Sequence, residues 1–144
     1  MSTARYLYTA SVLTNGKVLV AGGLHSSSVY LNSAELYDPS TGIWTNTSSM
    51  STARDYHTAS VLTNGKVLVA GGLGSSGFSV NSAELYDPST EMWTNTSMAG
   101  GYNSGGDVKS AELYDPSTEI WTNTSMAGGY NSDGDVKSAE LYQP

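Results

Sequence analysis

Cysteine is absent from all 144 residues, which excludes disulfides, thiolate metal sites and cysteine nucleophiles. Basic residues are scarce, because 6 Lys and Arg stand against 13 Asp and Glu, and they form no cluster. We therefore expect neither nucleic acid nor an anionic membrane surface as a partner. No apolar run reaches the ~20 residues that span a bilayer, and residues 1–12 do not resemble a signal peptide. The compartment stays undetermined, since a chain without cysteine tolerates either redox state.

Catalytic motifs are missing as well. The sequence has no G-x-S-x-G nucleophile elbow, no H-E-x-x-H zinc motif and no phosphate-binding glycine loop with a lysine. The two histidines, His25 and His57, stand at different positions of the repeat described below, so nothing in the sequence pairs them. These absences predict a protein that is not an enzyme and carries no cofactor.

Internal repetition dominates what is present. The segment TASVLTNGKVLVAGG occurs unchanged at residues 9–23 and 58–72, and SAELYDPST occurs three times. The SAELY copies are spaced by 49 residues and then twice by 28 residues. Such a period predicts an architecture of repeated units, each of them one supersecondary motif.

Each full unit is predicted to form four short strands, A to D. In the first unit these are Tyr8–Thr14, Lys17–Gly22, Ser33–Asp38 and Ile43–Thr47. Asn15-Gly16 and Asn64-Gly65 predict two-residue type I′ hairpin turns with positive φ at both residues. The apolar run VLVA is typical of a strand covered on both faces, and SAELYD alternates like a half-buried strand. The segment LHSSSVYLN between B and C is predicted to be a loop, and no segment shows a convincing helical period.

This pattern resembles the kelch repeat family. A Gly-Gly pair is followed by a Tyr and, seven residues after it, by a Trp, while Arg5 and Arg54 stand ahead of strand A. The resemblance covers nearly the whole chain and implies an all-β fold, a kelch-type β-propeller or an arc of one, with a four-stranded blade for each repeat. The positions that it marks as structural are Gly22, Gly23, Tyr37, Trp44, Gly71, Gly72, Tyr86, Trp93, Gly100, Gly101, Tyr114, Trp121, Gly128, Gly129 and Tyr142. We interpret the recurring Tyr and Trp residues as packing between blades rather than as ligand-stacking groups.

The later units are shorter than the first two. Residues 1–49 and 50–97 are predicted to form two full blades, whereas residues 98–125 have no counterpart of 51–69 and keep only a C–D hairpin. Residues 126–144 keep only strand C. A lone hairpin is marginally stable in water, so we expect the third unit to lean on the second blade or on another chain. The chain is interpreted as a fragment of a propeller, or as an arc that self-associates through its open blade edges.

Two details of the shortened units are predicted as well. Residues 93–101 are expected to be drawn into strand D of the second blade, with Gly100-Gly101 kept as a turn. The last strand, Ser138–Tyr142, lacks a D partner and is expected to be the least ordered part of the chain.

Metal chemistry has one weak candidate and one excluded site. Asn131, Asp133 and Asp135 are spaced two apart as in a calcium loop, but Val136 and Tyr142 stand where that loop needs Gly and Glu. The resemblance also extends to galactose oxidase, whose copper site needs a Cys cross-linked to a Tyr. This chain has no Cys, so we expect no such centre and no bound metal.

The loops between strands B and C differ most between units and are the predicted binding face. The residues there that would carry contact energy are His25, Tyr30, Phe78, Tyr102 and Tyr130. The expected function is a non-catalytic binding or scaffolding module for a protein partner. The alternatives are an extracellular carbohydrate-binding propeller and, third, a fragment of a galactose-oxidase-like enzyme.

Overall fold

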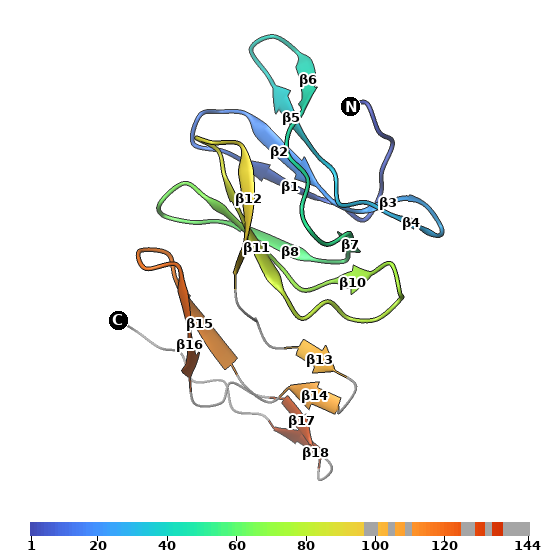
Figure 1. Ribbon diagram of the computed structural model, residues 1–144, viewed down its shortest axis with the longest axis vertical. Helices are drawn as coiled ribbons and strands as arrows, with labels where there is room; N and C mark the ends of the chain where they lie inside the picture. Colours follow the sequence, from blue (N-terminus) through green and yellow to red (C-terminus); the bar gives the residue numbers. More distant parts are fainter. Residues whose placement is uncertain (97–100, 104–105, 109–110, 125–128, 132–133, 137–144) are drawn as a thin grey trace.

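The computed structural model describes residues 1–96, 101–103, 106–108, 111–124, 129–131 and 134–136, with side chains over 1–96 and 114–122. Every regular element in this part of the chain is a β-strand (Figure 1). No helix among the described residues could cross a membrane. The all-β prediction is therefore confirmed.

Two four-stranded antiparallel sheets form the larger part of the molecule (Figure 1). The first has the order β1-β2-β5-β6, with β1 Thr9–Val12, β2 Val18–Ala21, β5 Ala34–Asp38 and β6 Ile43–Asn46. The second repeats this order with β8 Thr58–Val61, β9 Val67–Ala70, β11 Ala83–Asp87 and β12 Met92–Thr96. These strands confirm the predicted A-B-C-D order of both units, and we call the two sheets blade 1 and blade 2.

The A–B turns differ from the predicted type I′ turn. Gly16 N–H donates to Leu13 O at 2.9 Å, and Leu13 N–H donates to Lys17 O at 2.8 Å. The loop therefore has three residues, a type I turn followed by a left-handed residue. Gly16 has a φ of 82°, whereas Asn15 is not left-handed, and Gly65 in blade 2 repeats this geometry. The expectation of positive φ at Asn15 and Asn64 was wrong.

The B–C segments are more regular than the predicted loops. In the first unit, β3 Leu24–Ser26 pairs with β4 Val29–Tyr30, and Leu24 is buried. In the second unit, β10 Leu73–Gly74 pairs with β7 Arg54–Asp55. Short hairpins form at the corresponding place in the later units, β13 Gly101–Asn103 with β14 Gly106–Val108 and β17 Gly129–Asn131 with β18 Gly134–Val136. Backbone pairing of these segments satisfies N–H and C=O groups that an irregular loop would leave to water.

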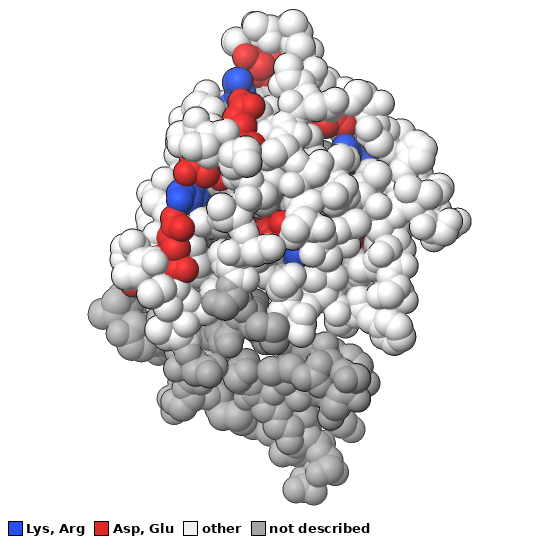
Figure 2. Space-filling model, in the orientation of Figure 1, with Lys and Arg blue, Asp and Glu red and all other residues white. Residues whose placement is uncertain are grey.

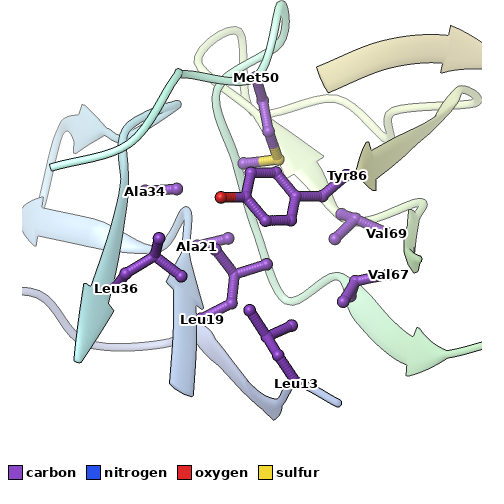
Figure 3. Packing of buried hydrophobic residues seen from close by; sticks show 9 residues of the cluster. All are labelled: Leu13, Leu19, Ala21, Ala34, Leu36, Met50, Val67, Val69 and Tyr86. Atoms are coloured by element: carbon purple, nitrogen blue, oxygen red, sulfur yellow. The ribbon is translucent and has the colours of Figure 1, made fainter. Parts of the chain in front are cut away.

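The core lies between the two blades (Figure 3). Alternation along the strands gives each blade two faces, which we name after their main residues. The leucine face of blade 1 consists of Leu13, Leu19, Ala21, Ala34 and Leu36. The valine face of blade 2 packs against it and consists of Ala59, Val67, Val69, Tyr86 and Trp93. Tyr86 is 0% exposed and packs against Trp93, with ring centroids 5.0 Å apart and ring planes tilted by 51°.

The third unit contributes a C–D hairpin, β15 Ala111–Asp115 with β16 Ile120–Thr124. It contacts blade 2, because Trp121 Nε1 donates to Thr96 Oγ1 at 3.0 Å and Asn64 Nδ2 donates to Pro116 O at 2.8 Å. Lys66 also forms an ion pair with Glu119. The hairpin therefore leans on blade 2, one of the two expected arrangements.

The predicted course between blade 2 and this hairpin was partly wrong. Of residues 93–101, those up to Thr96 lie in β12 as predicted, residues 97–100 lie outside the described part of the chain, and Gly101 begins β13 instead of forming a turn. Gly129 likewise begins β17. Gly100, Gly128 and the expected strand Ser138–Tyr142 lie outside the described residues.

Candidate binding groove

A groove of about 550 Å³ opens between the B–C segments of the two blades. Its walls come from β4 and the residues after it on one side and from the loop after β10 on the other, and the connection between the blades forms its floor. The lining residues are Tyr30, Asn32, Ser51, Thr52, Ala53, Gly74, Ser75, Ser76, Phe78, Ser79 and Val80. None of them is charged, although the chain has a net charge of −7.

Two aromatic residues line this groove, one from each B–C segment. Tyr30 ends β4, where its partner Leu24 is buried, so the short hairpin sets its position. Phe78 is 74% exposed, which is unusual for a phenylalanine. Both had been predicted as contact residues, and both lie on the groove.

The floor of the groove is held by buried charge. The carboxylate of Glu84 accepts the backbone N–H groups of Ser51 at 2.7 Å and Thr52 at 3.1 Å. Arg54 Nη2 lies 2.9 Å from the same carboxylate, and both side chains are at most 1% exposed. Removing either partner would leave an unpaired buried charge, which destabilises by about 3–5 kcal/mol. The backbone that lines the floor is therefore tied to strand β11 by buried contacts.

The same arrangement recurs at the start of the chain. Glu35 accepts the N–H groups of Ser2 at 2.6 Å and Thr3 at 3.1 Å, and it pairs with Arg5 at 2.9 Å. Burial raises the pKa of the Glu35 carboxyl, but these hydrogen bonds outweigh it and hold the pKa below its usual range. The sequence alone did not lead us to predict that Glu35 and Glu84 hold the backbone in this way. The signal was available, since each glutamate follows its arginine by 30 residues in segments with little other charge.

The glycine pairs let two segments of backbone approach each other closely. Gly72 has a φ of 95°, and a Cβ atom there would lie 2.3 Å from Asp55 O. Gly23 has a φ of 91°, and its Cβ would lie 2.5 Å from Tyr6 O. Only glycine combines this backbone conformation with so close an approach, which explains the Gly-Gly motif.

The two histidines lie away from the groove lining. The ring of His25 is exposed, and its Nδ1 lies 2.9 Å from the carbonyl oxygen of Ala4. His57 is buried between the blades, where Nε2 lies 2.8 Å from Thr9 Oγ1. Burial and the nearby Arg54 charge lower the pKa of His57 to about 4. His25, which the sequence predicts as a contact of the B–C loop, is exposed on β3 beside the Ala4 backbone and does not line this groove.

Metal and loop candidates in the later units fall largely outside the described side chains. The backbones of Tyr102, Tyr130, Asn131 and Asp135 lie in short strands, but their side chains are not described. Asp133 lies outside the described residues altogether. In the part of the chain that is described, no three His, Cys, Asp or Glu side chains come together as a metal site would require.

Charged side chains gather on another part of the surface. Figure 2 shows them along one edge, over the turns between A and B and between C and D. Lys66 bridges there to Asp87 at 3.5 Å and to Glu119 of the third unit. A smaller hollow of about 210 Å³ lies on this side and is lined by Lys66 and Asp87 among others. The uncharged groove is therefore chemically distinct from the turn side.

The fold and its sheet order define a class, namely arcs of β-propeller blades, each a four-stranded antiparallel sheet with strand A at one edge. The model of the kelch motif matches residues 5–51 and 56–97, together more than half of the chain, so the protein belongs to the kelch family. No curated protein matches it.

Two solved structures are similar in fold. One is a fungal alcohol oxidase of the AA5 family in complex with copper, with 26% identity and a TM-score of 0.52 over 62% of this chain and 18% of that chain. The other is YjhT, with 19% identity and a TM-score of 0.59 over 77% of this chain and 41% of that chain. The chain thus spans less than half the length of either structure.

Proposed function

We propose that this kelch arc is a non-catalytic binding module that takes a protein partner in the groove between its two B–C segments. The observation that carries the proposal is a groove with no charged lining to which each B–C segment contributes an aromatic residue, Tyr30 or Phe78. An aromatic group as exposed as Phe78 is the kind of anchor that dominates protein interfaces. The Glu84 and Arg54 contacts support it by fixing the floor before a partner arrives, which lowers the entropy lost on binding.

A neutral glycan is the second candidate. Serine, threonine and asparagine side chains line the groove beside the two aromatic rings, and such a set offers hydroxyl and amide hydrogen bonds next to an apolar surface. A copper enzyme finds no such support, because the described residues do not bring together a donor set for the metal. We therefore derive no reaction through copper.

The test compares peptides with glycans on the same protein. Phage-displayed random peptides and a glycan array are screened, and each hit is measured again with Phe78→Ala and with Ile43→Ala. Both side chains are exposed, but Ile43 begins β6 beside the C–D turn and does not line the groove. We expect peptide binding that weakens at least about tenfold in Phe78→Ala and is unchanged in Ile43→Ala.

The outcomes separate the candidates. Glycan binding with the same dependence on Phe78 favours the second candidate. Binding that is indifferent to Phe78 refutes the groove as the site in either case. Both variants should keep the stability of the parent protein within about 0.5 kcal/mol, because both residues lie on the surface.

A further inference from the structure

The leucine face of blade 2 is only half covered, unlike that of blade 1. In blade 1, the residues that the A and B strands contribute to this face are Leu13, Leu19 and Ala21. They are 3%, 2% and 1% exposed and pack against blade 2. Their counterparts in blade 2, Leu62, Leu68 and Ala70, are all partly exposed. The residues that strand C of blade 2 contributes to this face, Ala83 and Leu85, are 0% and 1% exposed. They are buried like the corresponding strand C residues of blade 1. The uncovered half is the part that strands A and B of a third blade would occupy.

In the register of blades 1 and 2, one edge of β15 holds the place at which strand C pairs with strand B. In blades 1 and 2, strand C pairs with strand B on one side and with strand D on the other. Among the described strands, β15 pairs with β16 alone. Hairpin β13–β14 forms a sheet of its own and lies apart from the β15–β16 hairpin in Figure 1. We call the surface of Leu62, Leu68 and Ala70, together with the edge of β15 that pairs with no described strand, the inner slot.

We propose that the inner slot binds a β-hairpin of a partner chain, which pairs with β15 and sets two alternating valines on Leu62 and Leu68. The interface between blades 1 and 2 argues for this occupant, because Val67 and Val69 cover Leu19 and Ala21 there and are both 0% exposed. The slot continues that interface in the next unit. An unpaired strand edge next to apolar surface is the site at which added strands bind, with main-chain hydrogen bonds for affinity and side-chain pockets for specificity.

Charge adds a second requirement for the occupant. Glu112 pairs with Asn123 in β15–β16 as Glu84 pairs with Asn95 in blade 2, so it holds the same register position. The segment that carries the matching arginine, residues 51–69 of the second unit, has no counterpart in the third. In blade 2 this arginine precedes strand A and pairs with the glutamate of strand C, so a hairpin of the same kind carries an arginine ahead of its first strand. The inferred partner is therefore a kelch-like A–B hairpin with an arginine before strand A and alternating valines in strand B.

The chain offers its own probe, a synthetic peptide of residues 50–72, which contains Arg54, Val67 and Val69. We expect the purified protein to sediment as a monomer and to bind this peptide 1:1 in isothermal titration. Amide hydrogen exchange in β15 should slow in the complex, because strand addition protects the backbone of the open edge. A peptide with V67S and V69S should bind at least about tenfold more weakly. A peptide with R54Q should also bind more weakly.

Protein variants locate the peptide. Leu68→Ser should weaken binding, whereas Val18→Ser on the valine face of blade 1 should not, although both side chains are partly exposed. Circular dichroism confirms that each variant is folded, and the peptide variants keep the test valid if Leu68→Ser is not. Equal binding of the parent and valine-to-serine peptides overturns the proposal. No saturable binding, or a dimer of the chain that the peptide does not dissociate, overturns it as well.

Discussion

Stability should fall between neutral and mildly acidic pH because of one buried histidine. His57 lies between the blades, 7% exposed, with its Nε2 2.8 Å from Thr9 Oγ1. Burial and the positive charge of Arg54 both oppose its protonation and lower its pKa from 6.5 to about 4. The unfolded chain therefore takes up a proton at a higher pH than the folded chain does. Stability linked to His57 is complete above pH 6.5 and is lost as the pH falls toward 4.

The size of this loss follows from the two pKa values. A full shift from 6.5 to about 4 corresponds to about 3 kcal/mol at 1.36 kcal/mol for each pKa unit. Between about pH 7 and about pH 5 the loss is about 2 kcal/mol, since the unfolded histidine is then almost fully protonated and the folded one is still mostly neutral. This is a large fraction of the stability of a small domain.

The assay is urea unfolding followed by tryptophan fluorescence at about pH 7, 6 and 5. His57→Gln can keep a hydrogen bond to Thr9 but cannot titrate, so its stability should change by about 2 kcal/mol less over this range than that of the parent. His25→Gln, at the exposed histidine, should behave like the parent. Asp55 has a pKa raised by burial, but it is present in every variant and cancels in the comparison. Equal pH dependence of the parent and His57→Gln would refute the reasoning.

Two substitutions test backbone conformation by the same unfolding assay. Gly72→Ala should destabilise by more than about 2 kcal/mol, because its Cβ would collide with Asp55 O at 2.3 Å, whereas Gly77→Ala, with a φ of 74° and no atom within 4 Å, should lose only about 1 kcal/mol. Similar losses for the two glycines would rule out the close approach as the cause. Glu91→Gly should stabilise by about 0.5–1 kcal/mol, because Glu91 has a φ of 56° at the position that Gly42 holds in the first unit. Its reverse, Gly42→Glu, should destabilise by a similar amount, and a stabilising effect there would contradict this account.

The strands of both blades could be predicted because their sequences repeat and alternate, but the A–B turn could not. Asn15-Gly16 is compatible with a two-residue and a three-residue loop. With two residues, Leu13 would lie opposite Val18 and point to the valine face. The observed loop pairs Val12 with Val18 instead, so Leu13 lies on the leucine face, 3% exposed. A slip of one residue moves a side chain to the other face, so packing between blades selects the longer loop.

The candidate groove was predictable only in part. Tyr30 and Phe78 could be singled out because they stand in segments that differ between otherwise identical units. The floor, Ser51–Ala53, could not, because its position depends on Glu84, a residue 33 positions away from Ser51. A contact over that distance forms only after the sheet has placed strand C beside the start of the unit. His25 stands in a variable segment too, but it lies at the backbone of Ala4 and does not line this groove.

The shortened third unit shows that a blade has two separable halves. The inner half is the hairpin of strands A and B, and the outer half is the hairpin of strands C and D. In blade 2, the outer half contacts the preceding blade through Trp93, whose Nε1 donates to Ser48 O at 2.9 Å, and through Tyr86, whose Oη lies 2.8 Å from Thr47 Oγ1. The third unit keeps its Tyr–Trp pair, with ring centroids 5.0 Å apart, and Trp121 bonds to Thr96 of the preceding blade. None of these contacts requires strands A and B of the same unit. The outer hairpin can therefore dock without them, and the missing strands leave Leu62 and Leu68 partly exposed instead of displacing the hairpin.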